Sequence, residues 1–143
     1  MTDEHFDNYL LYQLAMASHV VSSQFHAELE KSGIKPVAWR ILYCLWSKPD
    51  MRLTELARHV LYKQPRVTKQ IAQLEMDGLI TKTVKPDDRR NVYLRLTTKG
   101  QNIIYPLIQK SAKHETQILS VLSKTDQAKF RKTLSRLIAG LPE

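Results

Sequence analysis

Residues 63–97, KQPRVTKQIAQLEMDGLITKTVKPDDRRNVYLRLT, constrain the fold of this chain more than any other stretch. Val67, Ile71 and Leu74 stand at i, i+4 and i+7, the spacing that places side chains on one buried face of a helix. Pro65 suits the first turn of that helix, and Gly78 is typical of the position just past its end. The residues that this helix leaves exposed include no acid: Pro65, Arg66, Thr68, Lys69, Ala72 and Gln73.

Two short strands follow the helix. Residues 79–84 and 92–96 alternate apolar with polar side chains, as half-buried strands do. Residues 85–91 between them are too polar to be buried and predict a projecting loop. A basic helix followed directly by a basic hairpin is typical of a winged helix-turn-helix that binds duplex DNA.

Amphipathic helices flank this unit. Residues 5–32 carry apolar groups at a spacing close to 3.6 and predict one long helix that Gly33 ends. Part of its apolar stripe is expected to face a second protomer, although packing within one chain would use the same stripe. Pro36 suits the first turn of an apolar central helix that extends to Trp46.

Local capping signals predict the other helix boundaries. Thr54 is a plausible N-cap for a short helix over residues 55–61. Either Thr97 or Thr98 caps a further long helix, and the sequence does not decide between them. Ser123, followed by Asp126, starts a last helix that Gly140 stops. We therefore expect one domain over residues 1–143.

Positive charge extends beyond the proposed DNA-binding unit. The formal net charge is +8, which favours a polyanionic partner. Residues 53–97 hold nine Lys or Arg against five Asp or Glu, and residues 98–143 hold eight against three. Charge alone therefore does not single out residues 63–97.

Composition limits both the cellular location that we expect for the protein and the kinds of catalytic or metal site that it can form. No stretch approaches the roughly eighteen consecutive apolar residues of a membrane span, and the N-terminus lacks the pattern of a secretion signal, so we expect a cytoplasmic protein. The single cysteine, Cys44, cannot form an internal disulfide or a cysteine-based zinc site. The five histidines are scattered and no glycine-rich phosphate loop is present, so we expect no enzyme, cofactor or metal site.

Four ordered motifs resemble those of the MarR family of multiple-antibiotic-resistance regulators. WRIL at residues 39–42 resembles the family's W-R-I-L segment, and LTELA at 53–57 its L-T-E-L-A opening. LEMDGLI at 74–80 resembles L-E-x-x-G-L-I, and residues 88–100 match D-x-R-x5-L-T-x-x-G. Together the motifs lie within residues 37–100.

The resemblance implies a mainly α fold with a small two- to three-stranded β-wing. Its winged helix-turn-helix, residues 36–100, would be flanked by N- and C-terminal dimerisation helices at residues 1–35 and 101–143. It implies a homodimeric repressor, or sometimes an activator, that reads a palindromic operator. It also implies that Arg90 enters the minor groove and that Asp88 pairs with a neighbouring basic group to hold the wing.

Side-chain chemistry assigns roles on double-stranded DNA. Arg66 suits guanine and Gln73 suits adenine in the major groove. Thr68 and Lys69 suit phosphates, and Lys82, Lys85 and Arg89 would add attraction to the backbone. We predict that Arg90→Ala weakens operator binding and lowers its salt dependence. The predicted DNA-binding set is Pro65, Arg66, Thr68, Lys69, Gln73, Lys82, Asp88, Arg89 and Arg90.

Members of the family are typically released from DNA by small phenolic or aromatic acids bound between the dimerisation helices and the winged unit. Such a ligand needs a cation or several donors beside flat apolar walls. The first two long helices offer this mixture in His19, Ser22, Ser23, His26, Trp39, Arg40 and Tyr43.

Three alternatives remain open. Cys44 could make the protein redox-responsive, although a thiol in an apolar helix tends to be inert. A metal-sensing repressor is disfavoured because clustered Cys and His ligands are lacking. A winged domain could also serve as a protein-interaction module, and a salt-dependent gel shift separates that function from DNA binding.

Overall fold

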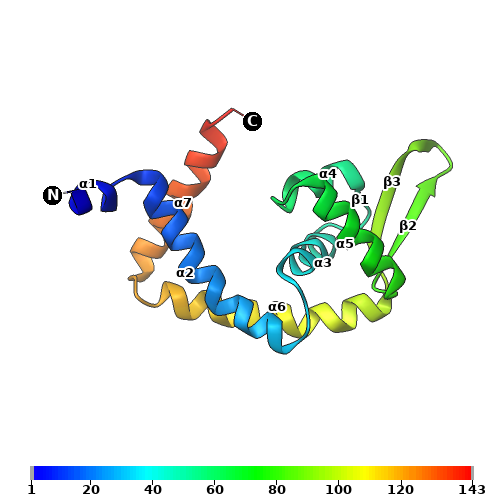
Figure 1. Ribbon diagram of the computed structural model, residues 1–143, viewed down its shortest axis with the longest axis horizontal. Coiled ribbons are helices and arrows are strands. Elements are labelled where there is room, and N and C mark those ends of the chain that lie inside the picture. Colours follow the sequence, from blue (N-terminus) through cyan, green and yellow to red (C-terminus); the bar gives the residue numbers. More distant parts are fainter. Residues whose placement is uncertain (1, 143) are drawn as a thin grey trace. The chain divides into compact units, whose positions relative to one another are not determined.

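The computed structural model describes residues 2–142. The chain divides into two compact units, residues 1–109 and residues 110–143, which are described separately. Within the described residues the chain is mainly helical, with seven helices and one three-stranded antiparallel sheet (Figure 1). The predicted fold class is therefore confirmed. No helix among residues 2–142 combines the length and hydropathy that a bilayer crossing requires.

The N-terminal segment forms two helices where the sequence predicted one. Helix α1 covers Thr2–Asp7 and α2 covers Leu10–Lys31. Tyr9 between them has an extended backbone (φ −72°, ψ 119°), and its N–H donates to the Phe6 carbonyl at 3.0 Å. The neighbouring Asn8 has low helix propensity because its side chain competes for backbone hydrogen bonds. The apolar spacing continues across this break, which is why periodicity alone did not reveal it.

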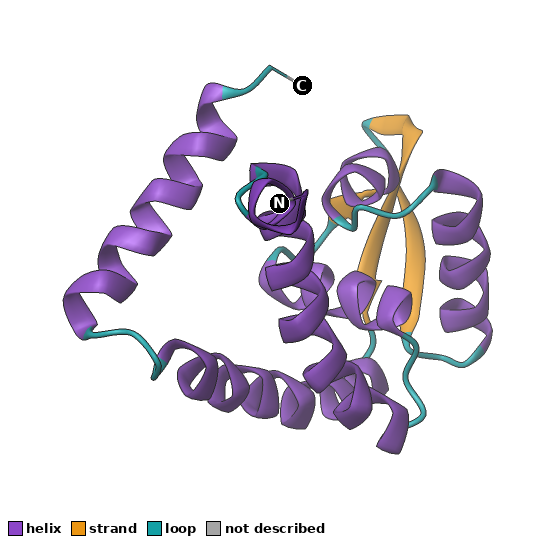
Figure 2. Cartoon of the chain, turned by 60° about the vertical axis from the view of Figure 1, so that its left-hand side comes forward, coloured by secondary structure: helices purple, strands orange, loops and turns teal. Residues whose placement is uncertain are grey.

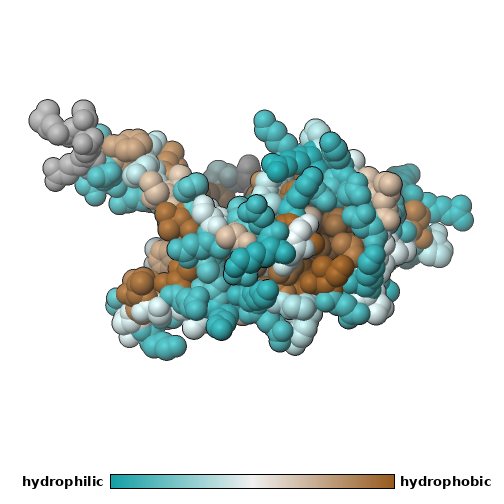
Figure 3. Space-filling model, turned by 60° about the horizontal axis from the view of Figure 1, so that its bottom comes forward, coloured by the Kyte–Doolittle hydropathy of each residue, from teal (hydrophilic) through white to brown (hydrophobic). Residues whose placement is uncertain are grey.

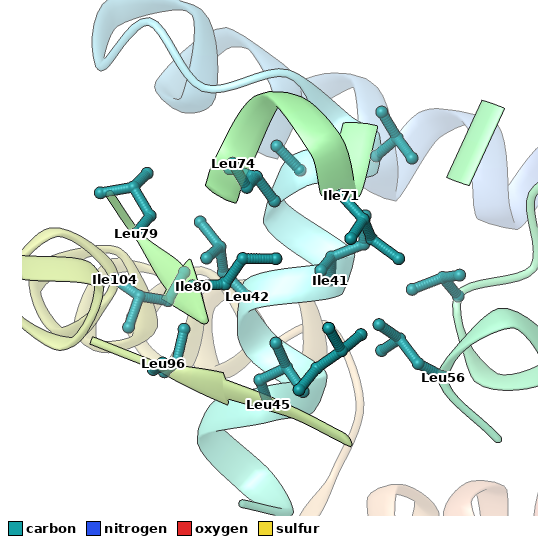
Figure 4. Packing of buried hydrophobic residues seen from close by; sticks show 14 of the residues in the cluster. Ile41, Leu42, Leu45, Leu56, Ile71, Leu74, Leu79, Ile80, Leu96 and Ile104 are labelled. Carbon is teal, nitrogen blue, oxygen red and sulfur yellow. The ribbon is translucent and has the colours of Figure 1, made fainter. Parts of the chain in front are cut away.

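Helix α3 (Pro36–Ser47) forms the centre of the first unit. Pro36 occupies its first turn as predicted, and Ile41, Leu42 and Leu45 are at most 1% exposed. Figure 4 shows these three side chains packed among apolar residues of α5 (Gln64–Met76) and of the sheet. Burial of several complete aliphatic side chains in one cluster is the main stabilising contribution to such a unit.

The sheet has the order β1-β3-β2 and lies beside α3, α4 and α5 (Figure 2). Its strands are β1 (Met51–Arg52), β2 (Ile80–Lys85) and β3 (Asp88–Leu96). Lys85 pairs with Asp88, so only Pro86 and Asp87 form the turn. The predicted projecting loop over residues 85–91 is therefore too long, because strand pairing continues to the hairpin tip.

Helix α4 (Leu53–His59) starts earlier than predicted. Arg52 is its N-cap, and no side chain donates or accepts a capping hydrogen bond there. The prediction of Thr54 as N-cap is therefore wrong. Because Met51 and Arg52 pair with β3, the chain leaves the sheet and enters the helix within one residue.

The junction between α5, β2 and α6 (Thr98–Leu119) is held by three side-chain hydrogen bonds. The Thr97 hydroxyl accepts from the Gly100 N–H at 3.0 Å, which identifies Thr97 as the cap of α6. The same hydroxyl donates to the Gly78 carbonyl at 2.6 Å, and the Lys99 ammonium donates to the Asp77 carbonyl at 2.9 Å. Gly78 has the left-handed φ of +76° that ends α5. The end of α5 is thus tied to the start of α6.

The second unit contains the end of α6 and all of α7 (Lys124–Gly140). The Ser123 hydroxyl accepts from the Asp126 N–H at 3.1 Å, which confirms the predicted start of this helix. Arg131 forms an ion pair with Glu115. No residue of α7 is buried, and its apolar Phe130 and Ile138 are exposed.

Candidate nucleic-acid interface

Helix α5 separates a buried face from a polar one. Val67, Ile71 and Leu74 are at most 2% exposed, which confirms the predicted apolar stripe. Every member of the predicted contact face of α5 is exposed: Pro65, Arg66, Thr68, Lys69, Ala72 and Gln73. Glu75 of the same helix is exposed as well, so the prediction that this helix exposes no acid is wrong. The face can therefore approach a large partner without disturbing the core.

Two side chains on this face already have contacts. The guanidinium of Arg66 lies 4.9 Å from the centroid of the Tyr62 ring. The Gln73 amide donates to the Asp77 carboxylate at 3.0 Å, which leaves its carbonyl oxygen and its second N–H free to form further bonds. Gln73 can thus offer both a donor and an acceptor without losing that bond.

Two lysines of β2 have partners. The Lys82 ammonium lies 3.7 Å from the Glu75 carboxylate at the end of α5. Lys85 lies 4.1 Å from the centroid of the Tyr93 ring. Pairing with Glu75 reduces the net positive charge that Lys82 offers to an anionic partner.

Arg89 and Arg90 lie in β3 next to the hairpin turn, and both are exposed. Within residues 2–142 neither arginine has an ion-pair partner. Exposed guanidinium groups without a carboxylate can form charge-assisted bonds with phosphate, or enter a narrow minor groove. The hairpin thus presents two unneutralised cations.

Within residues 2–142 Asp88 forms no ion pair with a basic residue, contrary to what the resemblance implied. Its carboxylate accepts two hydrogen bonds from the Asn91 amide, at 2.8 and 3.0 Å, and one from the Tyr93 hydroxyl at 2.8 Å. Neutral donors from β3 take the place of the expected cation. Sequence reasoning missed both residues, although they lie within five positions of Asp88.

This network shifts two pKa values. Hydrogen bonds from Asn91 and, second, from Tyr93 hold the pKa of Asp88 below its ordinary value of 3.8. The bond to Asp88 raises the pKa of Tyr93 above 10.0. A depressed folded-state pKa means that the network stabilises the wing above the pKa of an unfolded aspartate. That contribution is lost as the pH falls through the lower folded-state pKa. The network is therefore intact at neutral pH.

Asn91→Ala should raise the pKa of Asp88 toward 3.8, because it removes the largest cause of the shift. The measurement is an NMR pH titration of the Asp88 side-chain carboxyl carbon in both proteins. Tyr93→Phe, which removes the second donor, should give a smaller rise in the same direction. Equal pKa values in the wild type and Asn91→Ala would show that Asn91 does not hold Asp88 in solution.

The predicted effector residues are only partly brought together. The Trp39 ring packs between the rings of Phe25 on α2 and Tyr43. Its centroid lies 5.0 Å from that of Phe25 and 5.3 Å from that of Tyr43. Arg40 instead donates to the Val60 carbonyl at 3.0 Å and lies over the Tyr62 ring. On α2, Ser22 is half-buried, and the other predicted residues are exposed: His19, Ser23 and His26.

Two hollows open on the surface of the first unit. The smaller, of about 330 Å³, is lined partly by His26, Glu30 and Lys35. The larger, of about 660 Å³, is lined by residues absent from the predicted effector set, among them Trp46, Arg95 and Tyr105. Arg95 also forms an ion pair with Asp50. His26 is thus the one predicted effector residue that lines either of these two hollows.

Comparison with known proteins places the chain among helix-turn-helix regulators. The model of the MarR family matches residues 34–92. The HTH-type transcriptional regulator MhqR of Bacillus subtilis is 23% identical over 128 residues, which are 90% of this chain and 88% of MhqR. The crystal structure of the MarR family transcriptional regulator SPO1453 from Silicibacter pomeroyi is 34% identical, with a TM-score of 0.86 over 96% of this chain and 98% of that chain.

A third protein was solved on DNA. The transcriptional repressor CouR, bound to a 23-mer DNA duplex, is 25% identical to this chain. The TM-score is 0.80, and the match covers 92% of this chain and 94% of CouR.

Proposed function

Because the chain belongs to the MarR family of DNA-binding, non-enzymatic transcriptional regulators, we propose that it is a cytoplasmic homodimer that represses transcription from a palindromic operator until a small aromatic or phenolic ligand releases it. The observation that carries this proposal is the exposed contact face of α5 from Pro65 to Gln73, which holds no acid, together with two wing arginines that have no ion-pair partner within residues 2–142. The likeness to CouR, which was solved on a DNA duplex, supports DNA as the partner.

The two surfaces would divide the work of recognition. We assign Arg66 and Gln73 of α5 to base edges in the major groove, and Thr68 and Lys69 to phosphates. Pro65 would bring the first turn close to the backbone. Arg90 would enter the minor groove. The neighbouring charges of Lys82 and Arg89 would add attraction to phosphate, and Asp88 would stiffen the hairpin through Asn91 and Tyr93.

Dimerisation is proposed for residues 1–35 and 101–143, with residues 36–100 as the DNA-binding unit. Leu10 and Leu11 of α2 are 54% and 62% exposed, and Phe130 of α7 is 46% exposed. A second copy would remove these side chains from water, which is favourable in proportion to the area covered. Figure 3 shows one face of the molecule, on which apolar side chains lie among polar ones. Two winged units on a dyad would then read half-sites roughly 10 base pairs apart.

The ligand is proposed to bind along the aromatic row of Trp39 and Tyr43. His19, Ser22, Ser23 and His26 of α2 would supply polar contacts, and Phe25 joins α2 to this row. Arg40 would take part only by leaving the Val60 carbonyl. The larger hollow offers the same ligand class a second place, because Trp46, Arg95 and Tyr105 are among the residues that line it.

Redox control through Cys44 is not supported by its surroundings. The side chain is half-buried in α3, and burial raises the pKa of the Cys44 thiol above its ordinary value of 9.0, against smaller opposing effects of Arg40 and Lys48. The thiolate is the reactive form, so a raised pKa makes this cysteine a poor oxidant sensor.

The function is tested by selecting duplexes from a random-sequence library with the purified protein. We expect the selected duplexes to share a palindrome, to bind two chains, and to bind more weakly as salt increases, with a linear dependence of log K on log salt. Binding is measured by fluorescence anisotropy and stoichiometry by sedimentation.

Failure of the library to converge on any sequence would contradict sequence-specific binding, and a single chain on each duplex would contradict the dimer. Hydroxybenzoates added to the preformed complex test the effector separately. Release that Tyr43→Ala weakens would support the aromatic row, whereas release that only Tyr105→Ala weakens would favour the larger hollow.

A further inference from the structure

Tyr62 lies in the turn between α4 and α5 and contacts two arginines. The guanidinium carbon of Arg66, on the exposed face of α5, is 4.9 Å from the centroid of its ring. The guanidinium carbon of Arg40, on α3, is 5.0 Å from the same centroid. Both distances lie within the roughly 6 Å at which a cation is attracted to an aromatic face.

Arg40 is the fixed member of this trio. Its side chain is half-buried, and one of its nitrogens donates to the Val60 carbonyl at 3.0 Å, at the end of α4. Arg40 also belongs to α3, whose neighbouring Ile41 is fully buried. The central helix of the core thus holds one side of the contact with Tyr62.

The residue before Tyr62 has a strained backbone conformation. Leu61 has φ +61°, a left-handed conformation that is costly for a residue with a branched side chain. Its side chain is 78% exposed and so gains little from packing. Such strain persists only where the surrounding structure enforces it, and it often marks a functional segment. Here the strained residue leads directly into the ring that contacts Arg66.

We propose that Tyr62 is a positioning residue for DNA recognition: its ring holds the Arg66 guanidinium in place before DNA arrives. The inference rests on the proposed base contact of Arg66. An arginine side chain has many rotamers, and fixing one of them during binding costs conformational entropy. A ring that already restricts Arg66 removes part of that cost and so increases affinity and base selectivity.

The second arginine adds an electrostatic preference for an anionic partner. Arg40 and Arg66 carry like charges against one ring, and Coulomb repulsion between them is relieved when an anion approaches. Arg40 is held by a backbone carbonyl, whereas Arg66 lies on the exposed face of α5, so Arg66 is the member that DNA can reach while it stays against the ring. A nucleic-acid groove offers the negative potential that this arrangement lacks.

The test compares Tyr62→Leu, which keeps most of the apolar volume but removes the ring, with Tyr62→Phe, which keeps the ring and removes the hydroxyl. The probe is the best duplex that the wild type selects from a random library. Tyr62→Leu should weaken binding about two- to fivefold for each half-site, the value of one exposed cation–π contact. Tyr62→Phe should bind like the wild type. Thermal unfolding of both variants checks that they are folded.

A double-mutant cycle with Arg66→Ala separates this inference from the proposed function. If Arg66 contacts a base and Tyr62 positions it, Tyr62→Leu has no further effect in the Arg66→Ala background. An equal loss in both backgrounds, or tighter binding by Tyr62→Leu, would overturn the positioning role. Unchanged binding by Arg66→Ala alone would instead refute the base contact.

The hold of the Tyr62 ring on Arg66 can also be measured in the free protein, without DNA. NMR relaxation of the arginine Nε–H groups reports side-chain order on the picosecond to nanosecond timescale. The order parameter of Arg66 should exceed that of the unpaired Arg89, fall to a similar value in Tyr62→Leu, and stay high in Tyr62→Phe. Equal order for Arg66 and Arg89 in the wild type would show that the ring does not hold Arg66.

Discussion

Gly100→Ala is expected to destabilise the protein by roughly 3 kcal/mol or more, because the added methyl group has no room. A Cβ at Gly100 would lie 2.1 Å from the carbonyl oxygen of Leu79 and 3.1 Å from its carbonyl carbon. Both atoms belong to the backbone, so no side-chain rotation can relieve the clash. The start of α6 would have to move away from Leu79, and the Thr97 and Lys99 bonds to the end of α5 would lengthen.

Gly140→Ala is the matched control for this change. Among the described residues, no atom outside the neighbouring backbone lies within 4 Å of a Cβ at Gly140, and the residue ends α7 without a left-handed φ. Urea denaturation should therefore give a much lower midpoint for Gly100→Ala and a nearly unchanged midpoint for Gly140→Ala. Equal midpoints for the two variants would mean that α6 does not approach Leu79 as closely as the structure shows.

The second large effect is expected from removing positive charge from α5 and the wing together. The triple variant Arg66→Ala, Lys69→Ala and Arg90→Ala should lose roughly a hundredfold or more in affinity for the selected duplex. Each lost base contact costs about 1–3 kcal/mol, and each lost phosphate contact removes one neutralised phosphate charge. The three side chains are exposed, so the variant should remain folded. Arg90→Ala alone should lower both the affinity and the salt dependence by a smaller amount.

Local signals in the sequence predicted much of the fold. Pro36 and Ser123 mark helix starts as predicted, and the spacing of Val67, Ile71 and Leu74 gave the correct buried face of α5. These features depend on neighbours within a few residues, where helix geometry and capping preferences act directly. The exposed candidate face of α5 followed from the same spacing.

Contacts between distant residues could not be derived in this way. Met51 pairs with Leu94, and this pairing creates β1 and places the start of α4 at Leu53. The hydroxyl of Thr97, which caps α6 by accepting from Gly100, also donates to the Gly78 carbonyl, 19 residues away, and no local signal in the sequence indicates that second bond. The contact of Arg40 with Tyr62 depends on the packing of α3 against the α4–α5 turn.

The wing shows a different limit of sequence reasoning. The resemblance implied a basic partner for Asp88. The structure instead satisfies the carboxylate with Asn91 and Tyr93, and within residues 2–142 Arg89 and Arg90 have no ion-pair partner. Opposite charges that are close in sequence need not form an ion pair when neutral side chains donate hydrogen bonds to the carboxylate instead.

Net charge does not by itself identify the DNA-binding surface, because residues 98–143 are as basic as the winged unit. That second set of cations provides a matched control. Lys124, Lys129 and Lys132 of α7 are exposed, and replacing them with alanine removes the same three positive charges as the triple variant of α5 and the wing.

The most direct test of the DNA-binding assignment is a salt titration of duplex affinity for three proteins: the wild type, the α5 and wing triple variant, and the α7 triple variant. We expect the slope of log K against log salt to become markedly shallower in the α5 and wing variant, by about 0.9 for each lost phosphate contact, and to stay near the wild-type slope in the α7 variant. Equal slopes and affinities for the two triple variants would contradict the assignment, because binding would then follow total charge and not the surface formed by α5 and the wing.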